Sequence, residues 1–486
     1  MGGLSAEGQM WARRLSGEFG AWADGVERAG HCVRPVRLRG GAAAVDVGTG
    51  EVVREVSTEG RPDGVLLVAC GDRRAAVCPP CAETYRRDLW HVVAAGLRGD
   101  GDGGGGGGGD EWAGAVGVAG VSGGPVVFAT LTAPSFGSVH TVRADGSCRA
   151  RRTRPVCVHG YPRFCNARHQ RGDVVVGTAL CVHCYDYVGH VLWHSAVPEL
   201  WRRTTVELAR AVSRLSLELT GRHRSVREVG RALRFSYVRV AEWQRRAAVH
   251  LHAVIRLDGR GPDSEVTAPP VWATRELLVA AVREAADAVR VGLPSPDGIE
   301  RAATWGGQVD VRPVDDARRA AAYLAKYATK TASDSVPGLP VRRFGGRTLD
   351  RLRRKRVHWH VLMLAGTCLR LADHPACEGL RLAEHVHTLG YRGHHASKSR
   401  LYSTTMKALG EVRRAWRAQR NGGDVWTADP DTVVVGDWRL VGIGHASPGD
   451  ALLAEQLARD AATVRRAMRY HDVTPVRMVD DGEPAR

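Results

Sequence analysis

The stretch AAVHLHAVIRLDG (Ala247–Gly259) decides the fold, because it has the pattern of a β-strand that also carries chemistry. Apolar residues surround His250 and His252, and Asp258-Gly259 supplies a turn signal at the end. Side chains two apart on a strand point to the same face, so the two imidazoles are expected to project together. Two imidazoles on a rigid strand suit a divalent cation, and a third ligand would complete a facial set.

The segment FSYVRVAEW (235–243) is also strand-like and offers that third ligand. The polar turn Gln244-Arg245-Arg246 joins it to the histidine strand, so a hairpin is expected. In a hairpin Glu242, eight residues before His250, lies beside both histidines. Two other His-x-His pairs, His358/His360 and His385/His387, occur in the chain. The first of these is a rival metal site, which ranks lower because an arginine run precedes it and no tyrosine helix follows.

The segment DDARRAAAYLAKYATKTAS (315–333) predicts a helix, because Ala, Leu, Lys and Arg favour helices and Asp315 or Asp316 suits the N-cap. Tyr323 and Tyr327 stand four residues apart, and Lys326 and Lys330 each follow a tyrosine by three. The four side chains would therefore share one side of the helix. The alternative interpretation is a tyrosine packed on the core with lysines at the surface.

Together these segments resemble the HUH endonucleases, and among them the rolling-circle replication initiators. The matches are His250-Leu251-His252 to the central strand of that family, and Tyr323-Leu324-Ala325-Lys326-Tyr327 to its Tyr-x-x-Lys-Tyr helix. The earlier run PVVFATLTAPS (125–135) resembles the family's strand ending in a Thr-x-Thr-like motif, and the order of the three is the same. The stretches ATLTAPSFG, CVHCYDYVGHVLW, PELWRRTT and LGYRGHHASKSRLYSTT are similar to initiators of actinobacterial plasmids and integrative conjugative elements.

The resemblance implies an α+β fold with a central antiparallel sheet and flanking helices. It also implies a metal-dependent, site-specific DNA endonuclease and strand transferase. His250, His252 and Glu242 would hold Mg²⁺ or Mn²⁺, and Lys326 would hold the phosphate or stabilise the phenolate. Tyr323 would initiate, forming a 5′-phosphotyrosine link and a 3′-OH primer, and Tyr327 would serve termination. The expected partners are plasmid origin DNA, single-stranded or hairpin at the nick, and the host DNA polymerase.

The charge of the chain points to nucleic acid as well. The formal net charge is +17, although only five of the 69 basic residues are lysines. No signal pattern or long apolar run occurs, so a cytoplasmic location is expected. The stretches 342–366 and 389–420 are rich in arginine with interleaved aromatic residues, which suits phosphate contact and base stacking. A solvated basic face is the alternative. The candidate DNA-binding residues are Lys330, Arg392, Lys398 and Arg400.

No G-x-x-x-x-G-K-[ST] run occurs, because none of the five lysines follows a glycine. We therefore expect dependence on a host helicase.

Eleven cysteines in a chain with a cytoplasmic pattern predict metal sites or free thiols rather than disulfides. Nine precede residue 185, and two pairs have Cys-x-x-Cys spacing, which lets both thiolates reach one tetrahedral zinc. One expected structural zinc cluster comprises Cys32, Cys70, Cys78 and Cys81. The other comprises Cys157, His159, Cys165, Cys181 and Cys184, with Cys148 nearby. Buried reduced thiols are the alternative, and the fourth ligand of each set stays open.

The expected domains are an N-terminal region with a cysteine cluster (1–98), a glycine-rich linker (99–111) and an HUH nickase domain (112–335) with an inserted zinc knuckle (148–184). A mainly helical basic DNA-binding region (336–420) and a peripheral C-terminal region (421–486) follow. The last is expected to contain a short strand pair around VVVGDWRLVGIG (433–444), an amphipathic helix and a disordered tail from residue 479. Two other functions stay open: an HUH relaxase or transposase of a mobile element, and a non-enzymatic zinc-containing DNA-binding regulator.

Overall fold

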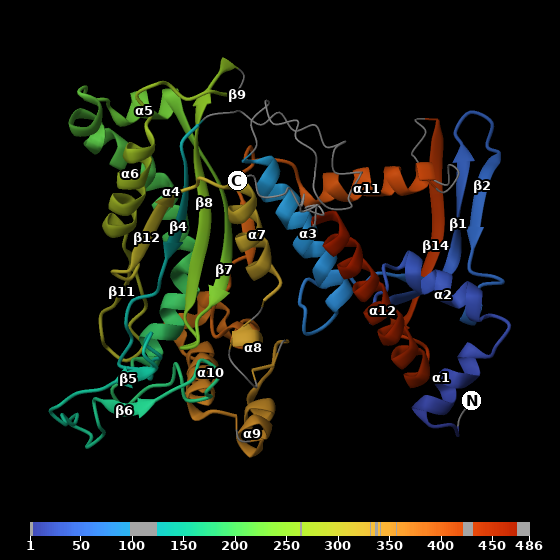
Figure 1. Cartoon of the computed structure of the whole chain (residues 1–486), viewed down its shortest axis with the longest axis horizontal. Coiled ribbons are helices and arrows are strands. Elements are labelled where there is room, and N and C mark those ends of the chain that lie inside the picture. The colour runs from blue at the N-terminus through green and yellow to red at the C-terminus, as the bar shows by residue number, and fades with distance from the viewer. Residues whose placement is uncertain are drawn as a thin grey trace, which may run out of the picture. The chain divides into compact units, whose positions relative to one another are not determined.

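The computed structural model describes residues 3–97, 124–262, 265–330, 332–335, 339–340, 342–355, 357–420 and 431–473 (Figure 1). The chain divides into two compact units. Unit 1 comprises residues 1–91, 102–118 and 404–486, and unit 2 comprises residues 92–101 and 119–403. The expected glycine-rich linker and disordered tail lie outside the described residues. Over the part of the chain that is described, no helix is long and apolar enough to cross a membrane.

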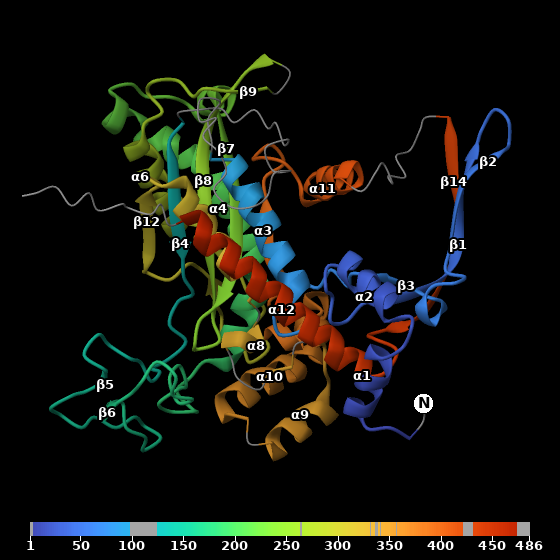
Figure 2. The same cartoon turned by 45° about the vertical axis from the view of Figure 1, so that its right-hand side comes forward.

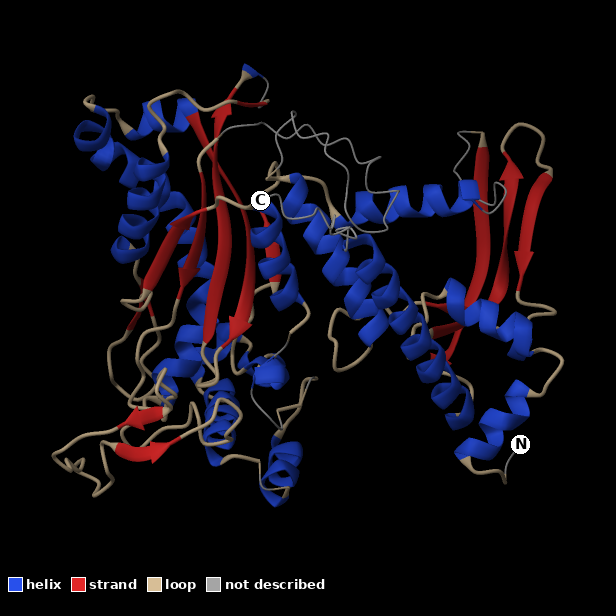
Figure 3. Cartoon of the chain, viewed as in Figure 1, coloured by secondary structure: helices blue, strands red, loops and turns tan. Residues whose placement is uncertain are grey.

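Unit 2 is built on an antiparallel sheet whose strand order is β12-β4-β8-β7-β13 (Figure 3). A sixth strand, β9, pairs with the last residues of β8. The histidine strand β8 therefore lies in the middle of this order. The bounds are β4 (Val126–Leu131), β7 (Leu233–Trp243), β8 (Val249–Arg260), β9 (Val266–Thr267), β12 (Val309–Pro313) and β13 (Ala396–Lys398). A mixed α+β fold with an antiparallel sheet, as the sequence predicts, is thereby confirmed.

The two faces of this sheet carry different residues. Leu251, Ile255 and Leu257 of β8 join the hydrophobic core formed with α4 (Tyr187–Thr220) and α6 (Arg275–Ala288). His252, on the opposite face, lies against α7 (Ala317–Ala328), and His250 shares that face. Helix α7 packs on β7 and β8 (Figure 1), and Figure 2 shows the same sheet turned by 45°. One strand thus supplies apolar side chains to the core on one side and polar side chains on the other.

Local sequence explains where the main helices begin and end. Asp186 caps α4 by accepting from the Gly189 amide, and Gly221 ends it in the left-handed conformation. Asp316 caps α7 by accepting from the Arg319 amide at 2.9 Å, so the second of the two expected aspartates is the N-cap. The remaining elements of unit 2 are β5 (Ser147–Arg149), β6 (Cys165–Arg168), α5 (Val226–Ala232), β10 (Val291–Gly292), β11 (Ala302–Ala303), α8 (Ala332–Ser335), α9 (Gly346–Arg354) and α10 (Trp359–Ala372), with short 3₁₀ turns at Pro375–Leu380, Leu382–Glu384 and Val386–Thr388.

Much of the segment expected to form a separate basic region belongs to unit 2. The helix α10 buries Val361, Leu364 and Ala365 in the same core as β8. The strand β13 pairs with β7 through Ala396 and Val240, so it extends the sheet. The helix α11 (Met406–Arg420), by contrast, belongs to unit 1.

Unit 1 joins the two ends of the chain, and here the sequence prediction was wrong. The segment expected to be a short strand pair is one continuous strand, β14 (Thr432–Ile443), which pairs antiparallel with β1 (Val36–Asp46) from Asp46↔Thr432 to Val36↔Ile443. The Gly436-Asp437 pair resembles a turn signal, but a long partner strand overrides it. A β-carbon on Gly40 would clash with the Asp437 carbonyl oxygen, so glycine permits the close approach at that point.

The C-terminal region is consequently an integral part of unit 1. Arg13, buried in α1 (Ala6–Arg14), donates from Nε to Asp450 Oδ1 at 2.8 Å at the start of α12 (Pro448–Val473). The other elements of unit 1 are α2 (Phe19–Arg28), β2 (Val52–Ser57), a 3₁₀ turn (Pro62–Gly64) and β3 (Leu66–Val68). The helix α3 (Pro79–Ala95) begins in unit 1 and ends in unit 2.

Candidate functional site

The hairpin expected from the sequence is present and sets the positions of three side chains. The Gln244 amide donates to the Ala248 carbonyl at 2.8 Å, and Ala247 adopts a left-handed φ of 63° to close the turn. The resulting register places Glu242 of β7 directly opposite His250 of β8. Side chains that face each other across strands have close β-carbons, so the carboxylate and the imidazoles meet on one face.

Glu242, His250 and His252 converge on a single point. Glu242 Oε2 lies 2.9 Å from His250 Nε2 and 3.0 Å from His252 Nε2. One donor atom from each of the three residues lies within 4.8 Å of the others, a spacing that fits one metal ion. The set combines one carboxylate oxygen and two imidazole nitrogens, which suits divalent cations that take nitrogen and oxygen ligands.

A threonine orients the second imidazole. Thr130 of β4 faces His252 across the strands, and its Oγ1 lies 3.1 Å from His252 Nδ1. Such a hydrogen bond fixes the ring so that the other nitrogen, Nε2, is directed at Glu242. Thr130 stands in the Thr-x-Thr-like run of the sequence. The neighbouring Thr132 instead donates from Oγ1 to the Gln308 carbonyl at 2.9 Å.

The two tyrosines of α7 lie against the same imidazole. The ring centre of His252 is 5.2 Å from that of Tyr323 and 5.3 Å from that of Tyr327. The tyrosine rings are 4.8 Å apart, and the edge of Phe128 packs on Tyr323 at 5.3 Å. Tyr323 is 41% exposed, whereas Tyr327 is partly buried. Both phenols expected from the helical spacing therefore border the cluster of Glu242, His250 and His252.

The environment changes the proton affinities of these groups. Burial acts to raise the pKa of Glu242, but hydrogen bonds to His250 and His252 outweigh it and lower the pKa to about 2. Burial lowers the pKa of His252, which keeps the ring neutral and able to bind a cation. Burial, together with the neighbouring phenol of Tyr327, raises the pKa of Tyr323 well above that of an ordinary tyrosine.

The two lysines of α7 have different surroundings. Lys330 Nζ lies 3.7 Å from Glu242 Oε1 and 4.6 Å from the centre of the Tyr327 ring. Lys326 Nζ lies 5.5 Å from the same ring on an exposed side chain. The sequence suggested Lys326 for the phosphate and Lys330 for DNA, and of these two lysines Lys330 is the one that lies near Glu242. Its spacing from Tyr327, three residues, is the signal that marks it as a neighbour of the site.

The other candidate DNA-binding residues divide by exposure. Lys398 is half-buried in β13, where Nζ donates to the carbonyls of Ser399, Arg400 and Ser403. Burial lowers the pKa of Lys398. Its ammonium group thus stabilises the bend after β13. Arg392 and Arg400 have exposed side chains.

The rival histidine pair is placed differently. His358 accepts the His360 amide at the start of α10, and the buried His360 ring hydrogen-bonds the Tyr187 hydroxyl at 3.1 Å. Among the described residues, neither of these rings nor His385 or His387 joins a group of donors spaced for a metal.

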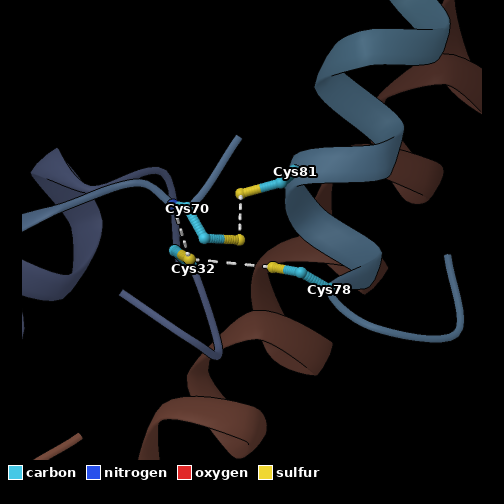
Figure 4. Close-up of side chains that lie close together, drawn as sticks. All are labelled: Cys32, Cys70, Cys78 and Cys81. Atoms are coloured by element: carbon cyan, nitrogen blue, oxygen red, sulfur yellow. Dashed lines mark hydrogen bonds between the residues drawn. The ribbon is translucent and has the colours of Figure 1, made fainter. Parts of the chain in front are cut away.

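The four N-terminal cysteines come together in unit 1 (Figure 4). Cys78 precedes α3 and Cys81 lies in its first turn, while Cys32 and Cys70 come from loops. The sulfurs of Cys32 and Cys78, and those of Cys70 and Cys81, are 3.7 Å apart. A disulfide needs about 2.05 Å, whereas zinc–sulfur bonds of about 2.3 Å in a tetrahedron separate sulfurs by about 3.8 Å. The cluster therefore has the dimensions of a four-thiolate zinc site.

The proton affinities of these thiols depend on one another. Hydrogen bonds with Cys32 and Cys78 raise the pKa of the Cys81 thiol far above its ordinary value. A divalent cation would bind thiolates rather than thiols, so its binding would release protons from the cluster. His445, just after β14, hydrogen-bonds from Nε2 to the Cys32 carbonyl at 3.2 Å, so the C-terminal part of unit 1 supports the cluster.

The second expected cysteine cluster divides in the structure. Cys157, His159, Cys181 and Cys184 lie together, with His159 Nδ1 at 3.3 Å from Cys184 Sγ. Cys165 is not part of this set, and it lies with Cys148 beside two histidines that the sequence interpretation missed, His140 and His169. Spacing in the sequence cannot assign ligands when two sets alternate along one segment. The only local signal was Cys165 followed by His169 after four residues.

Comparison with known proteins places the whole chain. A family model described as "Replication initiator protein, pSAM2" matches residues 18–459, which include the sheet, Glu242, His250, His252 and both tyrosines. A curated replication initiator protein of Streptomyces ambofaciens is 40% identical over 468 residues, covering 93% of this chain and 92% of that protein. No solved structure matches the chain significantly. The match over nearly all of both proteins shows that the chain belongs to the family of replication initiator proteins of the pSAM2 type.

Proposed function

We propose that this replication initiator nicks one strand of a plasmid double-strand origin through a tyrosine of α7. Attack by the phenol gives a 5′-phosphotyrosine link and a free 3′-OH, which primes rolling-circle replication. One observation carries the proposal. Tyr323 and Tyr327 both pack on His252, a member of the cluster of Glu242, His250 and His252. This combination of an HUH-like histidine strand and a tyrosine helix corresponds to the chemistry of an HUH endonuclease.

The cluster fits Mg²⁺ or Mn²⁺ better than a structural zinc ion. It has three protein donors, without sulfur, within 4.8 Å of one another. Structural zinc sites use four donors, mostly cysteine and histidine, whereas three donors leave positions for water or substrate. A bound divalent cation would polarise the scissile phosphate. The protein itself would hold the three donors in fixed positions. The strands β7 and β8 place Glu242 opposite His250, and Thr130 fixes the His252 ring.

In the cleavage step the phenol oxygen forms a bond to phosphorus, and the bond from phosphorus to the 3′ oxygen breaks. The phenol gives up its proton and the departing 3′ oxygen takes one up, so charge is conserved. Burial raises the pKa of Tyr323, which makes this proton loss costly in the resting site. Positive charge near the phenol offsets that cost. Lys326 and Lys330 both lie beside the ring of Tyr327, which neighbours Tyr323, and would supply such charge.

The phosphotyrosine intermediate suits a protein that must rejoin DNA. A phenol with a pKa of about 10 leaves phosphorus more readily than an alkoxide does. The bond energy is therefore kept for strand transfer. We assign initiation to Tyr323, which is the more exposed of the two. Tyr327 would cleave the regenerated origin after one round and end replication.

The expected substrate is the origin in single-stranded or hairpin form, as the resemblance to the HUH endonucleases implies. The formal charge of +17 favours binding to the DNA backbone. Host helicase and DNA polymerase complete the scheme, since the chain has no phosphate-binding ATPase motif. Structural zinc in the cysteine clusters would serve folding rather than cleavage.

The test is peptide mapping of the covalent adduct between the full-length protein and a single-stranded origin oligonucleotide with Mn²⁺. We expect the wild type to carry the adduct on Tyr323. Tyr323→Phe should lose the adduct, Tyr327→Phe should still nick but fail to terminate, and the control Tyr161→Phe, an exposed tyrosine outside α7, should behave as wild type. An adduct on Tyr327 alone would reverse the two roles.

The absence of an adduct on either tyrosine would overturn the proposal. If supercoiled plasmid with the cognate origin also stayed intact, the protein would act as a zinc-containing DNA-binding regulator. Cleavage at a transfer origin or transposon end, but not at a replication origin, would identify a relaxase or transposase of the same chemistry.

A further inference from the structure

Residues 138–185 of unit 2 hold two groups of metal-type donors that alternate along the chain. We define set A as His140, Cys148, Cys165 and His169, and set B as Cys157, His159, Cys181 and Cys184. We propose that each set binds one zinc ion, so that the segment is a two-zinc module with interleaved ligand pairs. Set A is an additional metal site, and the full chain then carries three zinc ions. The inference is independent of the nicking chemistry.

Set A has the dimensions of a tetrahedral site with two sulfurs and two nitrogens. Cys148 Sγ lies 3.7 Å from His140 Nδ1, and Cys165 Sγ lies 3.5 Å from His169 Nε2. Zinc–sulfur and zinc–nitrogen bonds of about 2.3 and 2.05 Å in a tetrahedron separate the two atoms by about 3.6 Å. The centres of the two imidazole rings are 5.3 Å apart. Four donors of the type used in Cys₂His₂ zinc sites thus meet at one point.

Backbone pairing and a backbone hydrogen bond hold the two cysteines of set A in position. Cys148 lies on β5 and Cys165 at the start of β6, and these strands pair with Arg149 opposite Cys165. The amide of Thr141 donates to Cys148 Sγ at 3.3 Å, a contact that stabilises a thiolate. The two sulfurs are therefore held on two short strands that pair with each other.

A carboxylate behind one histidine gives independent support. Asp173 Oδ2 lies 3.6 Å from His169 Nδ1, and the Gln170 amide donates to the same oxygen at 2.9 Å. The ring nitrogen that faces Cys165 is the other one, Nε2. A carboxylate on one ring nitrogen with the metal position at the other is the usual outer arrangement of zinc-binding histidines.

Set B forms a separate site of three sulfurs and one nitrogen. His159 Nδ1 lies 3.3 Å from Cys184 Sγ, 3.9 Å from Cys181 Sγ and 4.0 Å from Cys157 Sγ. The Cys157 amide donates to the Tyr161 carbonyl at 2.8 Å, and Gly160 turns the chain with a φ of 78°. This tight turn presents Cys157 and His159 as one knuckle, and the Cys-x-x-Cys pair is the other.

The two sets are connected by the path of the chain. Their ligand pairs occur in the order A, B, A, B, so the loop that carries Cys157 and His159 is closed by Cys148 and Cys165 of set A. In turn, the His140 amide donates to Thr178 and the Leu180 amide to Ser138, which places the first ligand of set A beside the last pair of set B. The metal in each set would therefore stabilise a loop that carries ligands of the other set.

The segment needs such cross-links because it buries few apolar side chains. Val156, Val158, Tyr161 and Val174 are all exposed, at 62%, 95%, 43% and 70%. A short segment without an apolar core is stabilised in other proteins by metal binding, whose free energy becomes folding free energy. Seven arginines with exposed side chains surround the two sets, at positions 143, 151, 152, 154, 163, 168 and 171. Donor–zinc bonds would hold the segment together against the mutual repulsion of these arginines.

The first experiment measures the zinc content of the purified full-length protein by elemental analysis. We expect three zinc ions per chain, falling to two in the double variant Cys148→Ser/Cys165→Ser. The control His183→Ala removes the exposed imidazole between Cys181 and Cys184, which belongs to neither set, and should keep three. Two zinc ions in the wild type, unchanged in the double variant, would overturn the proposal.

A second measurement decides the outcome if the double variant fails to fold. Cobalt(II) incorporated in place of zinc reports the number of thiolate ligands through the intensity of its sulfur-to-metal absorption. His169→Cys keeps four donors in set A and adds one thiolate, so it should retain three metal ions and gain absorption. Retention of three ions with an unchanged spectrum would show that His169 is not a ligand, and it would exclude set A as the proposed four-residue site.

Discussion

The sheet of unit 2 and the cysteine clusters hold donors for metal in opposite ways. On the sheet, Glu242, His250 and His252 supply three donors from two adjacent strands, without sulfur. The N-terminal cysteines supply four sulfurs from two loops and the start of a helix. Strands that are already stabilised by a core can hold a site with open positions. Loops without a core require a site in which every position is filled by protein.

Substitutions at the two kinds of site should affect different properties of the protein. Removing a ligand from the sheet site leaves the hydrophobic core of β8 intact, because the ligands and the core occupy opposite faces of the strand. Removing a donor from a four-donor cluster should weaken the link between the segments that the bound metal would join. The two kinds of site should therefore respond differently to the same type of substitution.

The largest effect is expected from His252→Ala. Loss of one of three donors should lower origin nicking by about 10³-fold, because a Lewis acid at phosphate contributes several kcal/mol to the transition state. The zinc content and the thermal unfolding temperature should stay near those of the wild type. Cys78→Ser is the contrasting variant, and it should lose one zinc ion and unfold at a lower temperature. If His252→Ala nicks normally, the metal site for cleavage lies elsewhere, and His358→Ala is the next variant to assay.

A smaller effect is expected from Thr130→Val, which keeps the side-chain shape but removes the hydrogen bond to His252 Nδ1. Loss of such a contact behind a metal-bound histidine typically lowers metal affinity about 10- to 100-fold. Titration with Mn²⁺ measures the change. Thr132→Val, just after the end of β4, is the matched control, because its hydroxyl donates to the Gln308 carbonyl rather than to one of the proposed metal ligands. Equal Mn²⁺ affinities in the two variants would show that Thr130 does not orient the ring.

The smallest effect, and one of opposite sign, is expected from Lys330→Ala. Its ammonium lies 3.7 Å from Glu242 Oε1 and competes with a cation for that carboxylate. A partly exposed ion pair contributes up to about 1 kcal/mol, so Mn²⁺ should bind up to about fivefold more tightly in the variant. Lys407→Ala, on the exposed face of α11, is the control. Weaker Mn²⁺ binding in Lys330→Ala would mean that the lysine supports the metal site instead of competing with it.

The parts of the site that sequence could predict are those set by local periodicity. Glu242 and His250 are eight residues apart across one turn, and the tyrosines and lysines repeat with the period of a helix. Local rules for hairpins and helices therefore place them. The same rules identify β8 as a strand, while its central position depends on partners elsewhere in the chain.

The missed features all depend on long-range pairing or on three-dimensional assignment. The strand β14 finds its partner in β1, at the other end of the chain, where no local signal exists. The alternation of sets A and B cannot be read from cysteine spacing, since each pair has a nearer neighbour in sequence than its true partner in space. Lys398 has the charge of a DNA-binding residue but faces three carbonyl groups of its own turn.

The alternation along β8 also has a genetic consequence. Near the hairpin turn, His250 and His252 face the proposed metal site, whereas Leu251 between them lies in the core. A substitution in this part of β8 should therefore harm activity at the histidines and stability at Leu251. Deletion of a single codon between the hairpin turn and His250 would exchange the two classes at once, placing imidazoles in the core and aliphatic side chains beside the tyrosines. Deletion of two codons would preserve parity, so the gene should tolerate the longer loss better than the shorter one.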